Sequence, residues 1–249
     1  STDSVRTEQD RVSGLEREPG FALRFDPPSL CATLLHEGQI DLGMIPTIAY
    51  QHREGYRVVP GAAIGSEGPV ASVALYTRVP LEKIRRVAAD TSSNTSVALL
   101  RVLSAERWGI APELVPAAPD LAAMTAAEEA ALLIGDPALF ADHEAMGLEK
   151  IDLGAEWTAM TGLPFIWASW AGRDGAIDPV GVDRLQRARA EGGAISDQVA
   201  DGYAAGYGRR IGGPVQPRAV GADDAPDIMA GREAVGAEIA GEAQQVGEL

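Results

Sequence analysis

Short apolar segments alternate with segments of helical periodicity along the first 170 residues, and this alternation restricts the fold more than any other feature. Strands that alternate with helices are typical of α/β proteins. The pattern predicts strands at 21–25, 40–45, 70–77, 85–89, 113–117, 130–134 and 165–170. It predicts helices at 28–38, with Ser29 as N-cap, at 96–107 and 121–129, and another that begins near Pro137.

Composition and charge restrict the class of function. The chain has 46% hydrophobic and 23% charged residues, as globular proteins do. No apolar run approaches the roughly 20 residues of a membrane helix. A formal net charge of −15 argues against binding to nucleic acid or to an anionic membrane surface, because both call for basic patches. An anionic ligand would therefore need a local device, such as an arginine or the N-terminus of a helix.

The chemistry-bearing residue types exclude further classes. One cysteine, Cys31, leaves no disulfide framework and no cysteine-rich metal site. The three histidines, His36, His52 and His143, are not at metal-ligand spacing, and no Walker loop, dinucleotide fingerprint or nucleophile elbow occurs. We therefore expect no metal site, and in particular neither a zinc nor a non-haem iron enzyme. The first thirteen residues are polar and charged, unlike a secretory signal, so either the protein is intracellular or a leader has been removed. We expect a cytoplasmic protein.

The strongest local feature is a polar segment between a predicted strand and a predicted helix, Asp90-Thr91-Ser92-Ser93-Asn94-Thr95-Ser96. Hydroxyl groups and free backbone N–H groups at the N-terminus of a helix form a natural site for an anion. Capping of the helix would account for one of these residues, such as Ser93. The run is longer than a cap requires, so capping and ligand binding both stay open.

A second helix start follows the predicted strand at 130–134. Asp136 suits the N-cap and Pro137 the first turn, so a structural cap is the favoured interpretation of Asp136. Gly135 could still bring a ligand close to the backbone. Trp167 and Trp170, on the last predicted strand, are interpreted as packing residues ahead of a role in substrate stacking.

Six segments occur in the order of a known family, among them Asp41-Leu42-Gly43-Met44-Ile45-Pro46 and Thr91-Ser92-Ser93-Asn94-Thr95-Ser96. The six ranges are 38–50, 59–64, 68–73, 89–96, 132–139 and 156–165. Together they resemble the chorismate dehydratase family of menaquinone biosynthesis. The resemblance covers residues 14 to 190.

The resemblance implies a two-lobed, type II periplasmic-binding-protein-like fold with a ligand cleft between the lobes. Lobe one would comprise residues 1–78 plus 172–249, and lobe two residues 79–171. The implied activity is that of a carbon–oxygen lyase in the futalosine pathway. An enzyme of this kind would remove water from the small anion chorismate to give 3-enolpyruvylbenzoate, without a cofactor.

The resemblance also implies a set of substrate-binding residues. A helix N-terminus with Ser92, Ser93, Thr95 and Ser96 would hold a substrate carboxylate. The remaining members of the set are Pro46, Thr47, Ser72, Gly135 and Asp136. No residue of the chain is assigned as the proton acceptor, for which a carboxylate of the substrate itself is one candidate.

Both ends of the chain depart from the family. Residues 1–13 contain no counterpart of the family's Ser-x-Leu-Asn loop, whose Asn is implicated in catalysis. A Gly- and Pro-rich stretch at 206–226, read as a loop, and an Ala/Gly/Glu-rich tail at 228–249 replace the family's helical pair. Two alternatives therefore stay open: a non-catalytic small-anion- or solute-binding protein on the same fold, and 1,4-dihydroxy-6-naphthoate synthase. The sequence specifies no oligomeric state.

Overall fold

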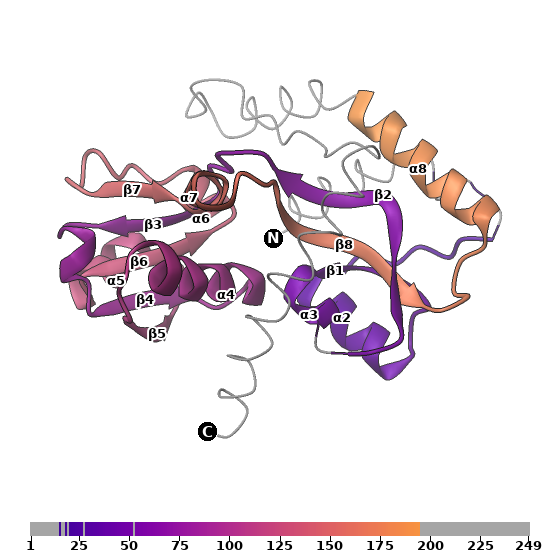
Figure 1. Cartoon of the computed structure of the whole chain (residues 1–249), viewed down its shortest axis with the longest axis horizontal. Coiled ribbons are helices and arrows are strands. Elements are labelled where there is room, and N and C mark those ends of the chain that lie inside the picture. The colour runs from indigo at the N-terminus through magenta and orange to yellow at the C-terminus, as the bar shows by residue number, and fades with distance from the viewer. Residues whose placement is uncertain (1–14, 16–17, 19, 27, 52, 195–249) are drawn as a thin grey trace.

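Two β-sheets organise the chain (Figure 1). The computed structural model describes residues 15, 18, 20–26, 28–51 and 53–194. A three-stranded sheet has the order β1-β8-β2, and a five-stranded sheet has the order β5-β4-β6-β3-β7. Each sheet with its helices forms one lobe, and the two lobes lie side by side in Figure 1. The predicted α/β, two-lobed architecture is confirmed.

The three-stranded sheet consists of β1 (Leu42–Pro46), β2 (Tyr56–Ser66) and β8 (Phe165–Arg173), and β8 is antiparallel to both neighbours. The helices of this lobe are α2 (Pro28–Glu37), α3 (Thr47–Gln51) and α8 (Pro179–Ala194). Successive side chains of a strand point to opposite faces of the sheet, and apolar residues cover both faces here. One face packs in a cluster with Leu35 and Ile45, and the other in a cluster with Leu15 and Leu185.

The five-stranded sheet consists of β3 (Val73–Thr77), β4 (Arg86–Asp90), β5 (Glu113–Ala117), β6 (Ala130–Ile134) and β7 (Glu149–Asp152). Strand β4 is parallel to β5 and β6, whereas β3 is antiparallel to β6 and β7. Its helices are α4 (Asn94–Val102), which continues as the π-helix η3 (Leu103–Arg107), α5 (Leu121–Ala127), α6 (Asp136–Leu139) and α7 (Leu153–Thr161); η2 (Leu81–Lys83) is a 3₁₀ turn.

Strand β6 lies at the centre of this sheet, and both of its faces are buried. Leu132 packs in one cluster with Leu75 and Leu100, while Leu133 packs in another with Met124. A strand that is covered on both faces needs apolar residues at consecutive positions. This requirement explains the unbroken apolar run from which β6 was predicted.

The chain passes between the sheets twice. The first connection, residues 67–72, joins β2 to β3, and the second, residues 162–164, joins α7 to β8. Strand β3 thus belongs to the five-stranded sheet and β8 to the three-stranded sheet. The division into lobes at 1–78 plus 172–249 and 79–171 stays a prediction.

Several predicted elements are confirmed with small changes of bounds, and others are wrong. Residues 21–25 form no strand, although Phe21 and Leu23 pack against the Leu15 cluster. Ser29 is not an N-cap, because α2 already begins at Pro28. Strands β2 and β7 and helices α3 and α7 were not predicted. The predictions for 206–226 and 228–249 lie outside the described residues.

Within the described part of the chain, no helix combines the length and the apolar character needed to cross a membrane.

Ionisation of Tyr76 makes the stability of the five-stranded sheet depend on pH in the alkaline range. Its side chain is fully buried, and its hydroxyl donates to the carbonyl oxygen of Ala138 at 2.7 Å. Burial above all, and then the negative charge of Asp152, raise the pKa of Tyr76 to about 12. A tyrosine in the unfolded chain ionises near pH 10 (a pKa of about 10). The folded state therefore holds this proton more tightly, and the stability that it contributes is lost above that pH.

We expect the free energy of unfolding of the wild type to fall between about pH 10 and 12, by up to about 1.4 kcal/mol per pH unit from this group. The variant Tyr76→Phe lacks the ionisable hydroxyl and should lack this component, although it is less stable at pH 7 because Ala138 loses its donor. Urea denaturation of both proteins across this range measures the difference. A parallel decline in the two proteins would contradict the prediction.

Candidate functional site

One edge of the five-stranded sheet collects most of the residues predicted to bind a ligand. Strands β4, β6 and β7 all run in the direction opposite to β3, so their carboxyl ends lie at the edge where β3 begins. Helices α4, α6 and α7 start directly after these ends. The carboxyl edge of an open α/β sheet is where such folds bind ligands. In Figure 1 this edge faces the other lobe.

Ser93 is the N-cap of α4, which settles the choice of capping residue in the polar segment. Its Oγ accepts from the backbone N–H of Ser96 at 3.3 Å and from the Ser96 hydroxyl at 3.0 Å. The backbone N–H of Ser92 is held by Asp90 Oδ1 at 2.9 Å, which fixes the loop before the cap. Asp90 and Ser96 are buried, whereas Ser92 is exposed. The loop thus presents Ser92 at the edge and keeps Ser96 inside.

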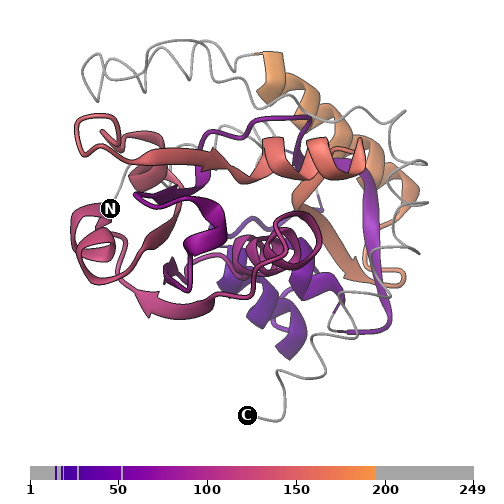
Figure 2. The ribbon, with the colours of Figure 1, turned by 60° about the vertical axis from the view of Figure 1, so that its left-hand side comes forward.

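Thr95 lies where the two lobes meet. It is 3% exposed, and its Oγ1 accepts from the backbone N–H of Ile48 at a long 3.5 Å. Thr47 begins α3, directly after Pro46 ends β1, and donates its hydroxyl to the carbonyl oxygen of Ile166 at 2.6 Å. The N-terminal residues of α3 and α4 therefore approach each other, and both views keep these two helices close (Figures 1 and 2).

Ser72 and Gly135 are brought together by a backbone hydrogen bond. The N–H of Gly135 donates to the carbonyl oxygen of Ser72 at 2.7 Å, next to the paired residues Val73 and Ile134. Gly135 has a φ of 69°, a left-handed conformation that favours glycine, and it occupies the N-cap of α6. The predicted N-cap role of Asp136 is therefore wrong. Because the chain turns at Gly135, Asp136 is the first residue of the helix, and it is exposed.

Two functional candidates on β7 escaped the sequence analysis. Asp152 caps α7 by accepting from Ala155 N–H at 3.0 Å, and its carboxylate also accepts from the N–H groups of Val70 and Ala71. Lys150 donates from Nζ to the carbonyl oxygen of Ala71 at 2.8 Å. Burial lowers the pKa of Lys150, and the charge of Asp152 opposes this effect. An Asp before a helix is a cap signal, but its contacts with Val70 and Ala71, 82 and 81 positions earlier, cannot be predicted from local sequence patterns.

The tryptophan and glutamate side chains near this region are structural. Trp167 donates from Nε1 to Ser66 Oγ at 3.1 Å, and its ring lies 4.4 Å from that of Phe165. Glu156 accepts from Trp108 Nε1 at 3.0 Å and pairs with Arg107 at 2.5 Å, which ties the end of η3 to α7. Trp167 also packs against the hydrophobic cluster that contains Leu132, as the preference for packing predicts.

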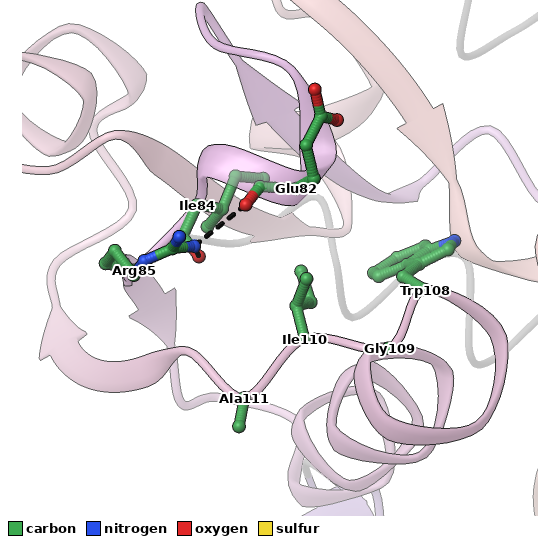
Figure 3. Close-up of a pocket in the computed structure, with 7 residues that line it drawn as sticks. All are labelled: Glu82, Ile84, Arg85, Trp108, Gly109, Ile110 and Ala111. Atoms are coloured by element: carbon green, nitrogen blue, oxygen red, sulfur yellow. Dashed lines mark hydrogen bonds between the residues drawn. The ribbon is translucent and has the colours of Figure 1, made fainter.

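Two surface hollows lie away from this edge. One of about 380 Å³ is formed where β4 and β5 begin, at the opposite edge of the sheet (Figure 3). There Arg85 donates from Nη1 to the carbonyl oxygen of Glu82 at 2.9 Å, and Trp108 and Ile110 supply apolar surface. Another, of about 190 Å³, lies beside residues 172–177. Neither touches a predicted site residue. Among the described residues, no group of three or more His, Cys, Asp or Glu could hold a metal ion.

Solved structures support the fold at low sequence identity. Protein AF1704 from Archaeoglobus fulgidus superimposes with a TM-score of 0.61 at 18% identity, over 98% of this chain and 95% of that protein. The periplasmic aliphatic sulphonate binding protein SsuA from Escherichia coli gives 0.56 at 18% identity, over 86% of this chain and 75% of its own. The predicted periplasmic-binding-protein-like fold is therefore confirmed.

Sequence comparison gives the family. The menaquinone biosynthesis family matches residues 12–209. Chorismate dehydratase from Thermus thermophilus is 31% identical over 213 residues, which are 79% of this chain and 76% of that protein. The family match contains all six residue ranges that carry the resemblance in the sequence. The chain therefore belongs to the chorismate dehydratase family of menaquinone biosynthesis.

Proposed function

We propose that this chain removes water from chorismate to give 3-enolpyruvylbenzoate, as a hydro-lyase of menaquinone biosynthesis that needs no cofactor. The observation that carries the proposal is the meeting of three family-like segments at one sheet edge, although they lie far apart in the sequence. These segments contain Ser72, Ser93 and Gly135. The 31% identity to a chorismate dehydratase supports the same activity.

The N-terminus of α4 is the part of this edge that we assign to a substrate carboxylate. The first N–H groups of a helix have no acceptor within the helix, and the helix dipole favours an anion there. Ser93 already satisfies the N–H of Ser96, so the N–H groups of Asn94 and Thr95 are the donors that we assign to the ligand. These dipoles act at close range, whereas distant surface charges are screened over about 8–10 Å. The net charge of −15 is then compatible with an anionic substrate.

The proposed reaction breaks one C–O bond and one C–H bond of the ring. The hydroxyl leaves with a proton as water, and the electron pair of the C–H bond completes the aromatic ring. Because aromatisation supplies driving force, the chain mainly has to hold the leaving hydroxyl and the departing proton in alignment. A carboxylate of the substrate is our candidate for the proton acceptor. Contact between the lobes at Thr95 and Ile48 would exclude water from the reacting groups.

A second candidate function is a solute-binding protein without catalysis. The structural likeness to SsuA, with a TM-score of 0.56, favours it, because that protein is a binding protein on the same fold. Fold alone does not separate the two, since one architecture serves both purposes.

Incubation of the purified chain with chorismate tests the proposal directly. We expect a product lighter by one water in mass spectrometry, with the absorbance of an aromatic ring. Unchanged chorismate, together with a melting temperature that rises with chorismate concentration, would favour the solute-binding protein instead. Neither turnover nor stabilisation would contradict both functions.

Substitutions at the start of α4 test the assigned anion site. We expect Ser93→Ala and Thr95→Ala to weaken chorismate binding about tenfold each, because each disturbs the loop that presents the N–H groups. Ser93→Ala should also cost about 1 kcal/mol of stability, since it removes a cap. Ser29→Ala, on the exposed surface of α2, is the matched control and should change neither quantity. Titration calorimetry measures the affinity, and urea denaturation measures the stability. Wild-type affinity for chorismate in the double variant Ser93→Ala/Thr95→Ala would overturn the assignment.

A further inference from the structure

The first connection between the sheets is anchored to one end of β7 and α7. The N–H of Gly68 donates to Thr158 Oγ1 at 2.9 Å, and the N–H of Val70 donates to Asp152 at 3.0 Å. Gly154 lets the connection pass close to α7, since a Cβ there would lie 2.7 Å from the carbonyl oxygen of Gly68. The connection therefore rests against α7 along much of its length.

Ala71 is held on both sides of its backbone. Its N–H donates to Asp152 Oδ2 at 2.6 Å, and its carbonyl oxygen accepts from Lys150 Nζ at 2.8 Å. Lys150 and Asp152 are two positions apart on β7, so their side chains leave the strand on the same face. A single strand end thus supplies an acceptor and a donor to one residue of the connection.

This double anchor maintains an unfavourable backbone conformation. Ala71 has a φ of 59°, and among the described residues it is the sole non-glycine residue with a positive φ. The left-handed conformation brings Cβ close to the following carbonyl oxygen, so a residue with a side chain adopts it only where its surroundings require it. The N–H of Ser72 donates to the carbonyl oxygen of Val70 at 2.7 Å and closes the turn, while the carboxylate of Asp152 holds the N–H groups of Val70 and Ala71 from outside it.

The turn at Ala71 decides where the next residue lies. Ser72 follows it directly, and the carbonyl oxygen of Ser72 receives the N–H of Gly135 at 2.7 Å. Two of the residues assigned to substrate binding are thus placed by the turn. We propose that Asp152 is a positioning residue of the candidate site, which fixes the left-handed turn at Ala71 and through it the placement of Ser72 and Gly135. The part that concerns the reaction rests on the proposed function.

The matched pair Asp152→Asn and Asp120→Asn tests this role. Both aspartates are N-caps, since Asp120 accepts from Ala123 N–H at 3.1 Å in α5 as Asp152 does from Ala155 in α7. Asp152 differs from Asp120 in that it also accepts from the N–H groups of Val70 and Ala71 in the first connection between the sheets. Asparagine keeps the shape of the side chain but leaves one oxygen where the carboxylate has two. We expect Asp152→Asn to lower kcat/KM for chorismate on the order of 100-fold through misplacement of the site, and Asp120→Asn to leave it unchanged.

Hydrogen exchange measures the turn itself, without reference to the reaction. In Asp152→Asn we expect the amides of Val70 and Ala71 to exchange about tenfold faster, while those of β6 keep their protection. In Asp120→Asn the exchange of residues 68–72 should match the wild type. Unchanged exchange of Val70 and Ala71 in Asp152→Asn would overturn the proposal, whatever the activity of that variant.

A second substitution separates positioning from simple loss of the α7 cap. Glycine adopts a positive φ without the steric cost of a Cβ. In the double variant Asp152→Asn/Ala71→Gly, the turn at residue 71 therefore depends less on hydrogen bonds from residue 152. We expect this double variant to regain about tenfold in kcat/KM over Asp152→Asn. No recovery would assign the loss to the cap and contradict the positioning role. Should the wild type leave chorismate unchanged, the proposed function fails, and the exchange experiment alone decides whether Asp152 fixes the turn.

Discussion

Strand β3 runs against the other four strands of its sheet, and the arrangement of the candidate site depends on this reversal. The chain enters β3 from the three-stranded sheet, through residues 67–72. A strand parallel to β6 would begin at the opposite edge, because neighbouring parallel strands start at the same edge. The antiparallel direction delivers the connection to the edge where α4, α6 and α7 begin. The connection between the lobes and the helix N-termini thus share one small region, in which Ser72 meets Gly135.

The sequence predicts the interior of the five-stranded sheet well and the irregular strands poorly. Strand β6 has the predicted bounds, because a strand covered on both faces shows its burial in its composition. Strand β5 also has the predicted bounds, although it is an edge strand with no fully buried residue. Strand β2 was missed since Pro60 and Gly61 interrupt it, and the structure absorbs them in a shift of register between Val58 and Ala63. Strand β7 has a single buried residue, Ile151, and offers too little pattern for a prediction.

In the candidate site, features that depend on neighbouring residues could be predicted from the sequence, whereas those that depend on distant residues could not. The cap at Ser93 was open to prediction, because the residue types favoured at a helix start are set by the nearest N–H groups. The turn at Ala71 was not, since a positive φ leads one to expect glycine, and alanine gives no signal. The contacts of Asp152 join positions more than 80 residues apart through backbone atoms, which carry no side-chain identity. Propensity and spacing cannot report such contacts.

Acidic residues at the edge determine which N–H groups remain for an anion. Asp90 takes the N–H of Ser92, Asp152 takes three others, and Ser93 takes that of Ser96. In a chain with a net charge of −15, Asp90 and Asp152 place negative charge beside the candidate site, so the proposed anion would depend on the remaining donors of the α4 N-terminus. The N–H of Ala71 is already taken by Asp152, so the contribution proposed for this turn is the placement of Ser72 and Gly135, on which the alignment of two bonds in the proposed reaction would depend.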